Sequence, residues 1–262
     1  MANTSNQALA AVKREVDGFG PQDAAAAQQL FDVADTLLEH RELAADLADR
    51  GAEAERKTAL IGRVFVNLQE RVRRVLEVAA QQRWDGADDL TAAVQEAAIR
   101  ATAQVSGAHE QLVGELNGFR DAVASNGELE LTLGSRLGSA EAKLQLVERL
   151  FGSKLGADTM RILRSLVRNT GGLRPRRFVN RAIELVADQA NRQVATITTA
   201  RALGDEQLAR LQAGLSARFG RTIAVNQIID PSVIGGIRVE LGDEVIDDTA
   251  AARLKELRLQ LA

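Results

Sequence analysis

The chain lacks cysteine and tyrosine, and its 262 residues include only one tryptophan, three prolines and two histidines. Without cysteine it forms no disulfide, no thiolate metal site and no cysteine nucleophile. His40 and His109 are each surrounded by polar and charged residues, so we interpret both as surface side chains rather than metal ligands or catalytic bases. No stretch has the spacing of a phosphate-binding loop. The sequence therefore predicts a protein that is not an enzyme and that holds no cofactor and no metal.

Long apolar runs are absent as well. No segment approaches the roughly 18 apolar residues that a membrane-spanning helix needs. Residues 1–10 have neither the basic start nor the apolar stretch of a secretory signal. The net charge is −3, and aromatic side chains do not alternate with the basic ones, which disfavours nucleic acid as a partner. We expect a chain that stays inside the cell, does not insert into a membrane and does not bind nucleic acid.

The composition that remains is typical of helices. Hydrophobic residues make up 45% of the chain and charged residues 26%, whereas aromatic residues make up only 3%. From residue 6 to about residue 194, apolar side chains recur at the i, i+3, i+7 spacing of one helix face, as Leu9, Val12 and Val16 do. No alternating run of strand type interrupts this stretch. We predict that it is helical throughout.

An internal repeat lies within the helical stretch. When the chain is shifted by 86 residues, 30–65 aligns with 116–151 without a gap, and 12 of the 36 aligned positions are identical. The most specific part is the run Ala54-Glu55-x-Lys57-x-x-Leu60-x-x-Arg63-x-Phe65, which recurs with the same spacing from Ala140 to Phe151. Self-similarity at a fixed period is typical of a duplicated structural unit. We predict two copies of one helical bundle, at 1–105 and 88–193, that share a helix near 88–104.

After residue 193 the pattern changes to short strands. Residues 194–199 are β-branched and alternating, which predicts a strand, and Asp205 is a suitable cap for a helix that ends before Gly220. Further strands are expected at 223–228, 237–241 and 244–246. Turns are expected at Asp230-Pro231, Gly235-Gly236 and Gly242-Asp243. A last helix, capped by Asp248 or Thr249, is expected to carry Leu254, Leu257 and Leu261.

These patterns together predict an α+β fold that is mainly α. One or two six-helix bundles are followed by a small β-α-β-β-β-α domain at 194–262. Nearly every residue of the C-terminal signals has a structural role and none carries out covalent chemistry. We therefore expect the small domain to act as an adaptor.

The C-terminal segment also carries a resemblance to a known family. The order Asp230, Pro231, Gly235, Gly236, Gly242 and Asp247, set among branched apolar residues, resembles the C-terminal signature of the delta subunit of F-type ATP synthases. The mitochondrial form of that subunit is the oligomycin sensitivity-conferring protein. The repeated Lys-x-x-Leu-x-x-Arg-x-Phe run is similar to part of the family's helical domain. Two features depart from the family: Asp248 stands where glycine is usual, and the helical bundle is predicted to be duplicated where ordinary members have one.

The resemblance implies a place in the peripheral stalk, or stator, of a proton-translocating ATP synthase. In the family, the helical domain holds N-terminal helices of the alpha subunits and the C-terminal domain meets the membrane-anchored b subunits. This link resists the torque that would turn the catalytic head with the central shaft. The resemblance further implies one copy in a hetero-oligomer at the cytoplasmic face of a bacterial plasma membrane.

The resemblance also implies docking residues, because the family holds the alpha-subunit helix on the first and fifth helices of the helical domain. Those positions fall here on Leu9, Val12, Val16, Val72, Val75 and Leu76, and in the second copy on Met160, Leu163 and Val167. The alternative interpretation of each residue is an internal core position, since helix faces in globular proteins are mostly apolar for that reason.

A basic helix face is the remaining charged feature. Arg161, Arg164 and Arg168 follow the i, i+3, i+7 spacing, and further arginines follow them at Arg174, Arg176, Arg177 and Arg181. Three interpretations stay open: a solvated or internally paired face, a docking surface for an acidic partner helix, or a nucleic-acid surface.

A second function from another class is a free-standing helical interaction scaffold or regulator. Its small α/β tail would then only resemble the ATP synthase family. The two functions differ in one observable property. A stator subunit co-purifies with alpha, beta and b subunits, whereas a scaffold of this second kind does not.

Overall fold

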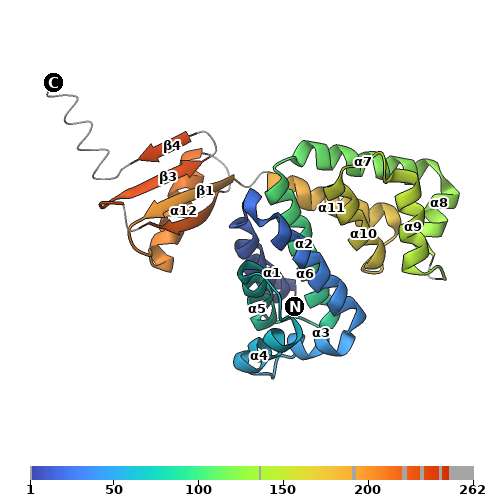
Figure 1. Ribbon diagram of the computed structural model, residues 1–262, viewed down its shortest axis with the longest axis horizontal. Coiled ribbons are helices and arrows are strands. Elements are labelled where there is room, and N and C mark those ends of the chain that lie inside the picture. The colour runs from blue at the N-terminus through green and yellow to red at the C-terminus, as the bar shows by residue number, and fades with distance from the viewer. Residues whose placement is uncertain are drawn as a thin grey trace. The chain divides into compact units, whose positions relative to one another are not determined.

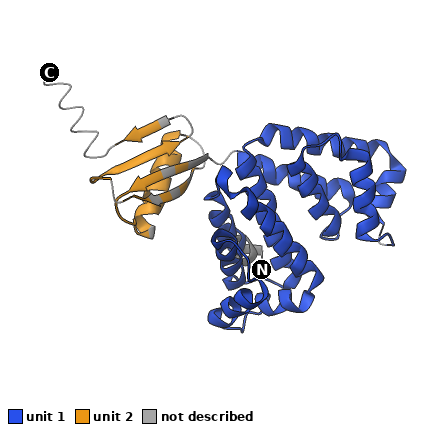
Figure 2. Ribbon diagram, in the orientation of Figure 1, with its two compact units in different colours: residues 1–190 blue, residues 191–262 orange. Residues whose placement is uncertain are grey.

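The computed structural model describes residues 2–135, 137–190, 193–219, 223–230, 233–241 and 244–247. The chain divides into two compact units, residues 1–190 and residues 191–262 (Figure 2). The first unit is helical and the second combines strands with a helix, so the predicted fold class, α+β and mainly α, is confirmed. The helix expected at 248–262, with its cap Asp248 or Thr249 and with Leu254, Leu257 and Leu261, lies outside the described residues.

The first unit runs from α1 to α11 (Figure 1). Its elements are α1 (Ala2–Asp17), the 3-10 turn η1 (Pro21–Asp23), α2 (Ala24–Glu39), α3 (Arg41–Ala48), α4 (Ala54–Val64), α5 (Glu70–Gln81), α6 (Ala87–Ser106), α7 (His109–Ser125), α8 (Gly127–Gly134), α9 (Ala140–Phe151), α10 (Ala157–Arg168) and α11 (Pro175–Ala190). Polar side chains cap α8 and α9 at their first turns: Asn126 accepts the N–H of Leu129, and Ser139 accepts that of Ala142.

The buried positions of the helices follow the internal repeat. A shift of 86 residues moves the buried face of α2 onto that of α7, and the paired residues are Ala26/Leu112, Leu30/Leu116, Val33/Phe119 and Leu37/Val123. In α5 and α10 the shift is one residue longer, as the buried pairs Val75/Ile162 and Leu76/Leu163 show. The extra residue lies between Phe151 and α10. Equivalent helices of the two halves therefore bury equivalent faces.

Helix α6 lies between the two sets of helices. It contacts α1, α2, α3 and α5 on one side and α7, α10 and α11 on the other. Every residue from Leu90 to Ala103 is buried except Ala92. This helix corresponds to the segment predicted to be shared by both bundle copies. The division into two bundle domains itself stays a prediction, because residues 1–190 form one compact unit.

A network of charges centred on the buried Glu96 and Arg100 surrounds the middle of α6. Arg100 donates from Nε to Glu96 at 2.9 Å and from Nη1 to Asp188 at 2.6 Å. Arg181 donates to the second oxygen of Glu96 at 2.9 Å, and the Lys13 ammonium lies 3.4 Å from the first. The side chains of Glu96 and Arg100 are each 3% exposed. Since Lys13 belongs to α1 and Arg181 and Asp188 to α11, the network ties three helices together.

The buried side chain of Gln189 extends this network. Its amide nitrogen donates to Asp17 at 3.1 Å and to Gln104 at 3.0 Å. The end of α1, the end of α6 and the end of α11 are thus held in one register by directional hydrogen bonds rather than by apolar packing alone.

The second unit is a four-stranded sheet with a helix. Its elements are β1 (Gln193–Thr199), α12 (Asp205–Phe219), β2 (Ile223–Ile229), β3 (Ile237–Leu241) and β4 (Glu244–Asp247). The strand order is β2-β1-β3-β4, with β1 parallel to β2 and antiparallel to β3. Its core consists of Ala195, Ile197, Leu215, Ile223, Val239 and Leu241. The expected β-α-β-β-β order matches the described part of the unit.

The turn before β3 depends on two glycines. Gly235 and Gly236 have φ angles of +68° and +82°. Side chains of L-residues are strained in this region, whereas glycine is not. The N–H of Asp230 donates to the carbonyl of Thr199 at 2.8 Å, which joins the end of β2 to the end of β1 just before this turn.

Replacing Gly236 by alanine is expected to destabilise the second unit by about 1–2 kcal/mol, because the added Cβ is strained at positive φ. Hydrogen exchange of the β1 and β3 amides measures the change. Gly214→Ala in α12 is the matched control, since Gly214 is exposed with open space around a new Cβ. That substitution is expected to stabilise the unit by about 0.5–1 kcal/mol. Equal protection in the two variants would contradict this account of the turn.

Replacing Arg100 by alanine is expected to destabilise the first unit by about 3 kcal/mol, because the buried Glu96 carboxylate loses a partner. Urea unfolding followed by the fluorescence of Trp84, the only tryptophan, reports on this unit. Arg41→Ala is the control: Arg41 pairs with Asp88, but the two side chains are 72% and 80% exposed. Its effect is expected to stay within about 0.5 kcal/mol. If Arg100→Ala lowers the free energy of unfolding no more than Arg41→Ala does, the network adds no stability.

Candidate functional site

The residues predicted to dock the alpha subunit lie mainly in the core of the first unit. Of those on the first and fifth helices, all but Leu9 are at most 1% exposed, namely Val12, Val16, Val72, Val75 and Leu76. Leu9 is half-buried against the same core. In the second half, Met160, Leu163 and Val167 are buried too. These side chains hold α1, α5 and α10 in place, so a partner has to contact the residues beside them. The docking role stays a prediction.

Helix α1 keeps a solvent-exposed strip that α6 does not have. Gln7, Ala10 and Arg14 are exposed along α1. The 86-residue shift moves these positions onto Ala93, Glu96 and Arg100 of α6, and all three are buried. The packed pair α1 and α5 is thus open at its surface, whereas the equivalent surface of α6 is covered by the rest of the unit.

The predicted basic face is paired within the chain. The ion pairs are Arg161 with Asp158 at 2.7 Å, Arg164 with Glu148 at 2.9 Å, and Arg168 with Asp35. The last pair joins α10 to α2, and burial raises the pKa of Asp35 although the guanidinium of Arg168 opposes the shift. Of the interpretations left open by the sequence, the internally paired face describes this geometry. A docking role for the three arginines stays a prediction.

Arginines beyond α10 differ in how they are paired. Arg181 belongs to the buried network, and Arg176 donates to Glu130 at 3.0 Å. Arg174 and Arg177 make no ion pair within the described part of the chain. Both line a surface hollow whose two carboxylates, Asp121 and Glu130, are paired with Arg120 and Arg176. The unneutralised positive charge of this region therefore lies at the start of α11 rather than on α10.

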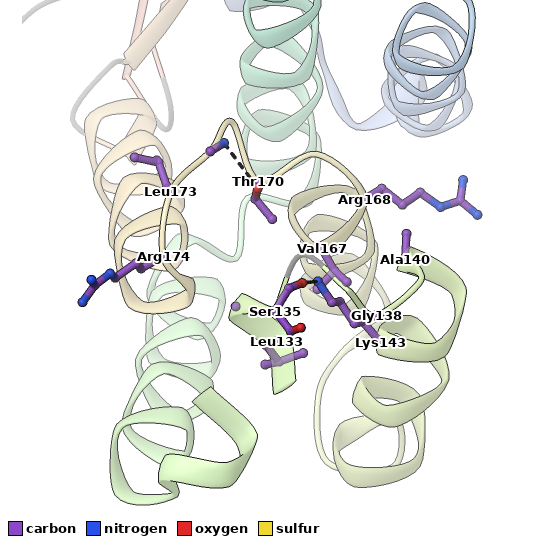
Figure 3. A pocket seen from close by; sticks show the side chains of 12 residues that line it. Leu133, Ser135, Gly138, Ala140, Lys143, Val167, Arg168, Thr170, Leu173 and Arg174 are labelled. Atoms are coloured by element: carbon purple, nitrogen blue, oxygen red, sulfur yellow. Dashed lines mark hydrogen bonds between the residues drawn. The ribbon is translucent and has the colours of Figure 1, made fainter. Parts of the chain in front are cut away.

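A pocket of about 490 Å³ opens beside Arg174, between the end of α8, the start of α9 and the loop that joins α10 to α11. Figure 3 shows its lining: Leu133, Gly134, Ser135, Gly138, Ala140, Lys143, Val167, Arg168, Thr170, Gly172, Leu173 and Arg174. The ammonium of Lys143 donates to the carbonyl of Ser135 at one wall. Sequence reasoning singled out Arg168 and Arg174 of this lining as basic residues, but it missed the pocket, because the other lining residues come from three separate segments and carry no common motif.

Trp84 closes the equivalent junction in the first half. It lies in the loop between α5 and α6 and is only 3% exposed. Its indole N–H donates to the carbonyl of Ala79 at 2.7 Å, and its own carbonyl accepts the Nε of Arg50 at 2.8 Å. Arg50 also pairs with Asp85 at 2.6 Å. Trp84 thereby joins the end of α5 to the loop after α3, just before α6 begins.

The signature residues of the C-terminal segment serve the turns of the second unit. Gly235 and Gly236 supply the positive φ angles before β3, and Asp230 ends β2. Asp247 is the last residue of β4. Pro231 and Gly242 lie outside the described residues. The described members of the signature therefore have structural positions in the sheet and its turns.

The described residues offer no chemical centre. Within them, no group of three or more His, Asp or Glu side chains is arranged to hold a metal ion. His40 is exposed, whereas His109 is half-buried and burial lowers its pKa. No helix in the described ranges is long and apolar enough to cross a membrane. Packed amphipathic helices, internally paired charges and a small α/β unit together define a helical adaptor protein.

Comparison with known proteins identifies the family. The pattern of the family described as "ATP synthase delta (OSCP) subunit" matches residues 93–261. The chain is 38% identical over 263 residues to the ATP synthase subunit delta of Leifsonia xyli subsp. xyli, with 100% of both chains covered. It is 34% identical over 273 residues to that of Acidothermus cellulolyticus, again with 100% of both covered. The chain belongs to the ATP synthase delta (OSCP) subunit family, a non-catalytic component of the peripheral stalk.

The family match begins inside α6. It therefore covers α6 to α11 and the second unit, and α1 to α5 precede it. The resemblance expected from the sequence is confirmed, and so is the expectation of a non-catalytic stalk subunit. A chain in the cryo-EM structure of the Toxoplasma gondii mitochondrial ATP synthase hexamer aligns with 64% of this chain and 96% of its own length at 22% identity, with a TM-score of 0.27, too low for a structural conclusion.

Replacing Trp84 by alanine is expected to destabilise the first unit by about 3–5 kcal/mol, because it leaves a cavity that the sealed junction cannot fill. Thermal or urea unfolding followed by circular dichroism measures the change. Leu173→Ala is the control at the equivalent junction of the second half, where the side chain is 37% exposed beside an existing pocket. Its cost is expected to stay below about 1 kcal/mol. Similar costs at the two sites would mean that the junctions are equally packed.

Proposed function

We propose that the protein links the catalytic head of a bacterial ATP synthase to its membrane-anchored b subunits, as one copy per complex at the cytoplasmic face of the plasma membrane. Membership of the delta (OSCP) subunit family is the observation that carries the proposal. A helical unit and a separate α/β unit suit a link with one partner on each unit. The work is mechanical, because such a link resists rotation of the head by staying bound.

The alpha-subunit helix docks on α1 and α5. These helices pack on one another and keep exposed positions beside their buried core, whereas the equivalent positions on α6 are buried. Along the two helices, half-buried apolar side chains lie beside exposed polar ones; the apolar ones are Leu9, Ala11 and Val78, and the polar ones are Gln7, Arg14, Arg74 and Gln81. Such a surface accepts an amphipathic helix through its apolar face.

The first half of the helical unit therefore carries the head contact, although the family pattern aligns with the second half. The reason is steric. The resemblance to the family implies that the first and fifth helices of a single bundle hold the alpha-subunit helix, which requires the first helix to be accessible. Here α6, which takes that position in the second half, is covered along Leu90 to Ala103 except at Ala92. The other helices of the unit cover this surface of α6, and α1 and α5 present an equivalent surface that is open.

The b subunits contact the second unit. Its sheet has β2 and β4 as edge strands, and each edge carries an exposed apolar side chain: Ile229 is 55% exposed and Val245 is 52% exposed. Ile234, in the turn between β2 and β3, is 74% exposed. The unpaired backbone groups of a sheet edge can pair with another chain, and apolar side chains on that edge add to such a contact.

Affinity capture of the tagged chain from solubilised source membranes tests the proposal. Alpha, beta and b subunits are expected to co-purify with one copy of the chain. Ala10→Trp, which places a bulky side chain on the exposed strip of α1, is expected to lower recovery of alpha and beta by at least about tenfold while b is retained. Ala92→Trp, at the exposed position of α6, is the matched control and is expected to recover all three.

Two other results would count against parts of the proposal. Full recovery of alpha and beta by Ala10→Trp would show that the head contact lies elsewhere than on α1 and α5. Recovery of none of the three subunits by the unchanged chain would favour the alternative function, a free-standing helical scaffold.

A further inference from the structure

The two halves of the helical unit can be compared position by position at the junction where the pocket lies. Leu133 and Lys143 line the pocket, and the 86-residue shift pairs them with Leu47 and Lys57. All four are buried. Equivalent elements therefore build the junction in both halves. The filled junction of the first half shows which kind of side chain fits the open junction of the second.

The difference between the halves lies in one loop. Trp84 is the third residue after α5 and the third before α6. Counted in the same two ways, its counterparts after α10 and before α11 are Gly171 and Gly172. Both glycines have positive φ angles, +57° and +74°, and an added Cβ on either would meet no atom within 4 Å. The second half has glycine where the first half has the sealing tryptophan, and open space lies next to it.

The buried lysine of each half has a different hydrogen-bond acceptor. In the first half the ammonium of Lys57 donates to the carbonyl of Ala80 at 2.7 Å, at the end of α5 beside the carbonyl that accepts Trp84. In the second half Lys143 donates instead to Ser135, on the loop after α8 (Figure 3). The space next to the end of α10 is thereby left to another occupant. The pocket of about 490 Å³ exceeds many times the roughly 10–15 Å³ that one water needs.

Exposed apolar and basic side chains surround the pocket, and the one carboxylate of the adjoining hollow, Glu130, is paired with Arg176. Leu137, in the loop after α8, is 99% exposed, and Leu131 on α8 is 76% exposed. Leu131 lines an adjoining hollow that shares Gly134, Ser135 and Arg174 with the pocket. Arg174 and Arg177 remain without an ion pair in the described ranges. Large exposed apolar side chains beside unpaired cations are complementary to a partner with acidic and apolar residues.

We propose that this pocket receives a bulky apolar side chain from an acidic segment of another subunit of the same complex, in the way that Trp84 seals the first half. The side chain replaces the missing tryptophan and the acidic residues pair with Arg174 and Arg177. The inference rests on the proposed function, because it takes the partner from the assembled stalk. It adds a second contact on the helical unit, distinct from α1 and α5.

Single-cysteine labelling tests this inference, since the chain has no cysteine of its own. Ala140→Cys places a thiol on the pocket lining, and Ala54→Cys places one at the equivalent position of the first half; both alanines are exposed. The rate of maleimide labelling is compared between the isolated chain and the captured complex. Cys labelling at position 140 is expected to slow by at least about tenfold in the complex, because interface cores exclude solvent. Labelling at position 54 is expected to change little.

A photo-crosslinker attached at position 140 then identifies the occupant. Crosslinks to a segment of another subunit that carries acidic residues and a bulky apolar residue support the proposal. Crosslinks within this chain, or to a segment without acidic residues, overturn it. In a second experiment the crosslinker is attached at a position next to 140. Ala140→Trp, which fills the pocket from its rim, is expected to abolish the crosslinks to the partner. Ala54→Trp is expected to leave them unchanged.

The two levels of the proposal fail in different ways. If the unchanged chain captures no alpha, beta or b subunit, the proposed function is overturned and this inference with it. If the chain captures them but the thiol at position 140 reacts equally fast in the complex, only the pocket proposal is overturned.

Discussion

The structure depends on the burial of α6 on all sides. Every residue from Leu90 to Ala103 is buried except Ala92, and the helix contacts elements from both halves of the unit. Burying the Glu96 and Arg100 charges costs desolvation energy, which the hydrogen bonds from Arg181 and to Asp188 offset. Such bonds are directional, so they set the register of α1, α6 and α11 in a way that interchangeable apolar contacts do not.

Duplication around this helix explains why equivalent residues of the two halves have different surroundings. The exposed positions of α1 correspond to buried positions on α6, since elements of both halves, α1 and α11 among them, lie against that helix. At the loops after α5 and α10, in contrast, the second half is the open one. Trp84 fills the junction of the first half, whereas Gly171 and Gly172 leave that of the second half open. The two halves share a fold and a buried pattern, but each keeps a different surface available to partners.

A stalk subunit needs contacts that last rather than groups that react, and the chain is built accordingly. Its arginines on α10 are paired with carboxylates of the same chain. The described signature residues of the second unit hold turns and strand ends, with Gly236 at a φ angle of +82°. Resistance to torque comes from well-packed units and long-lived interfaces, so residues that secure packing are functional residues in this protein.

The sequence by itself determined the order of elements, the repeat and the family. Local signals suffice for these, because helix periodicity, strand alternation and glycine turns act over a few residues, as the match of 237–241 to β3 shows. Only the tertiary structure decided which faces stay open. Periodicity places Val72 and Val75 on one apolar helix face. It does not show that this face is covered by the same chain rather than by a partner. Likewise the spacing of Arg161, Arg164 and Arg168 cannot reveal acidic partners that lie elsewhere in the sequence, as Asp35 does, because ion pairs form across space.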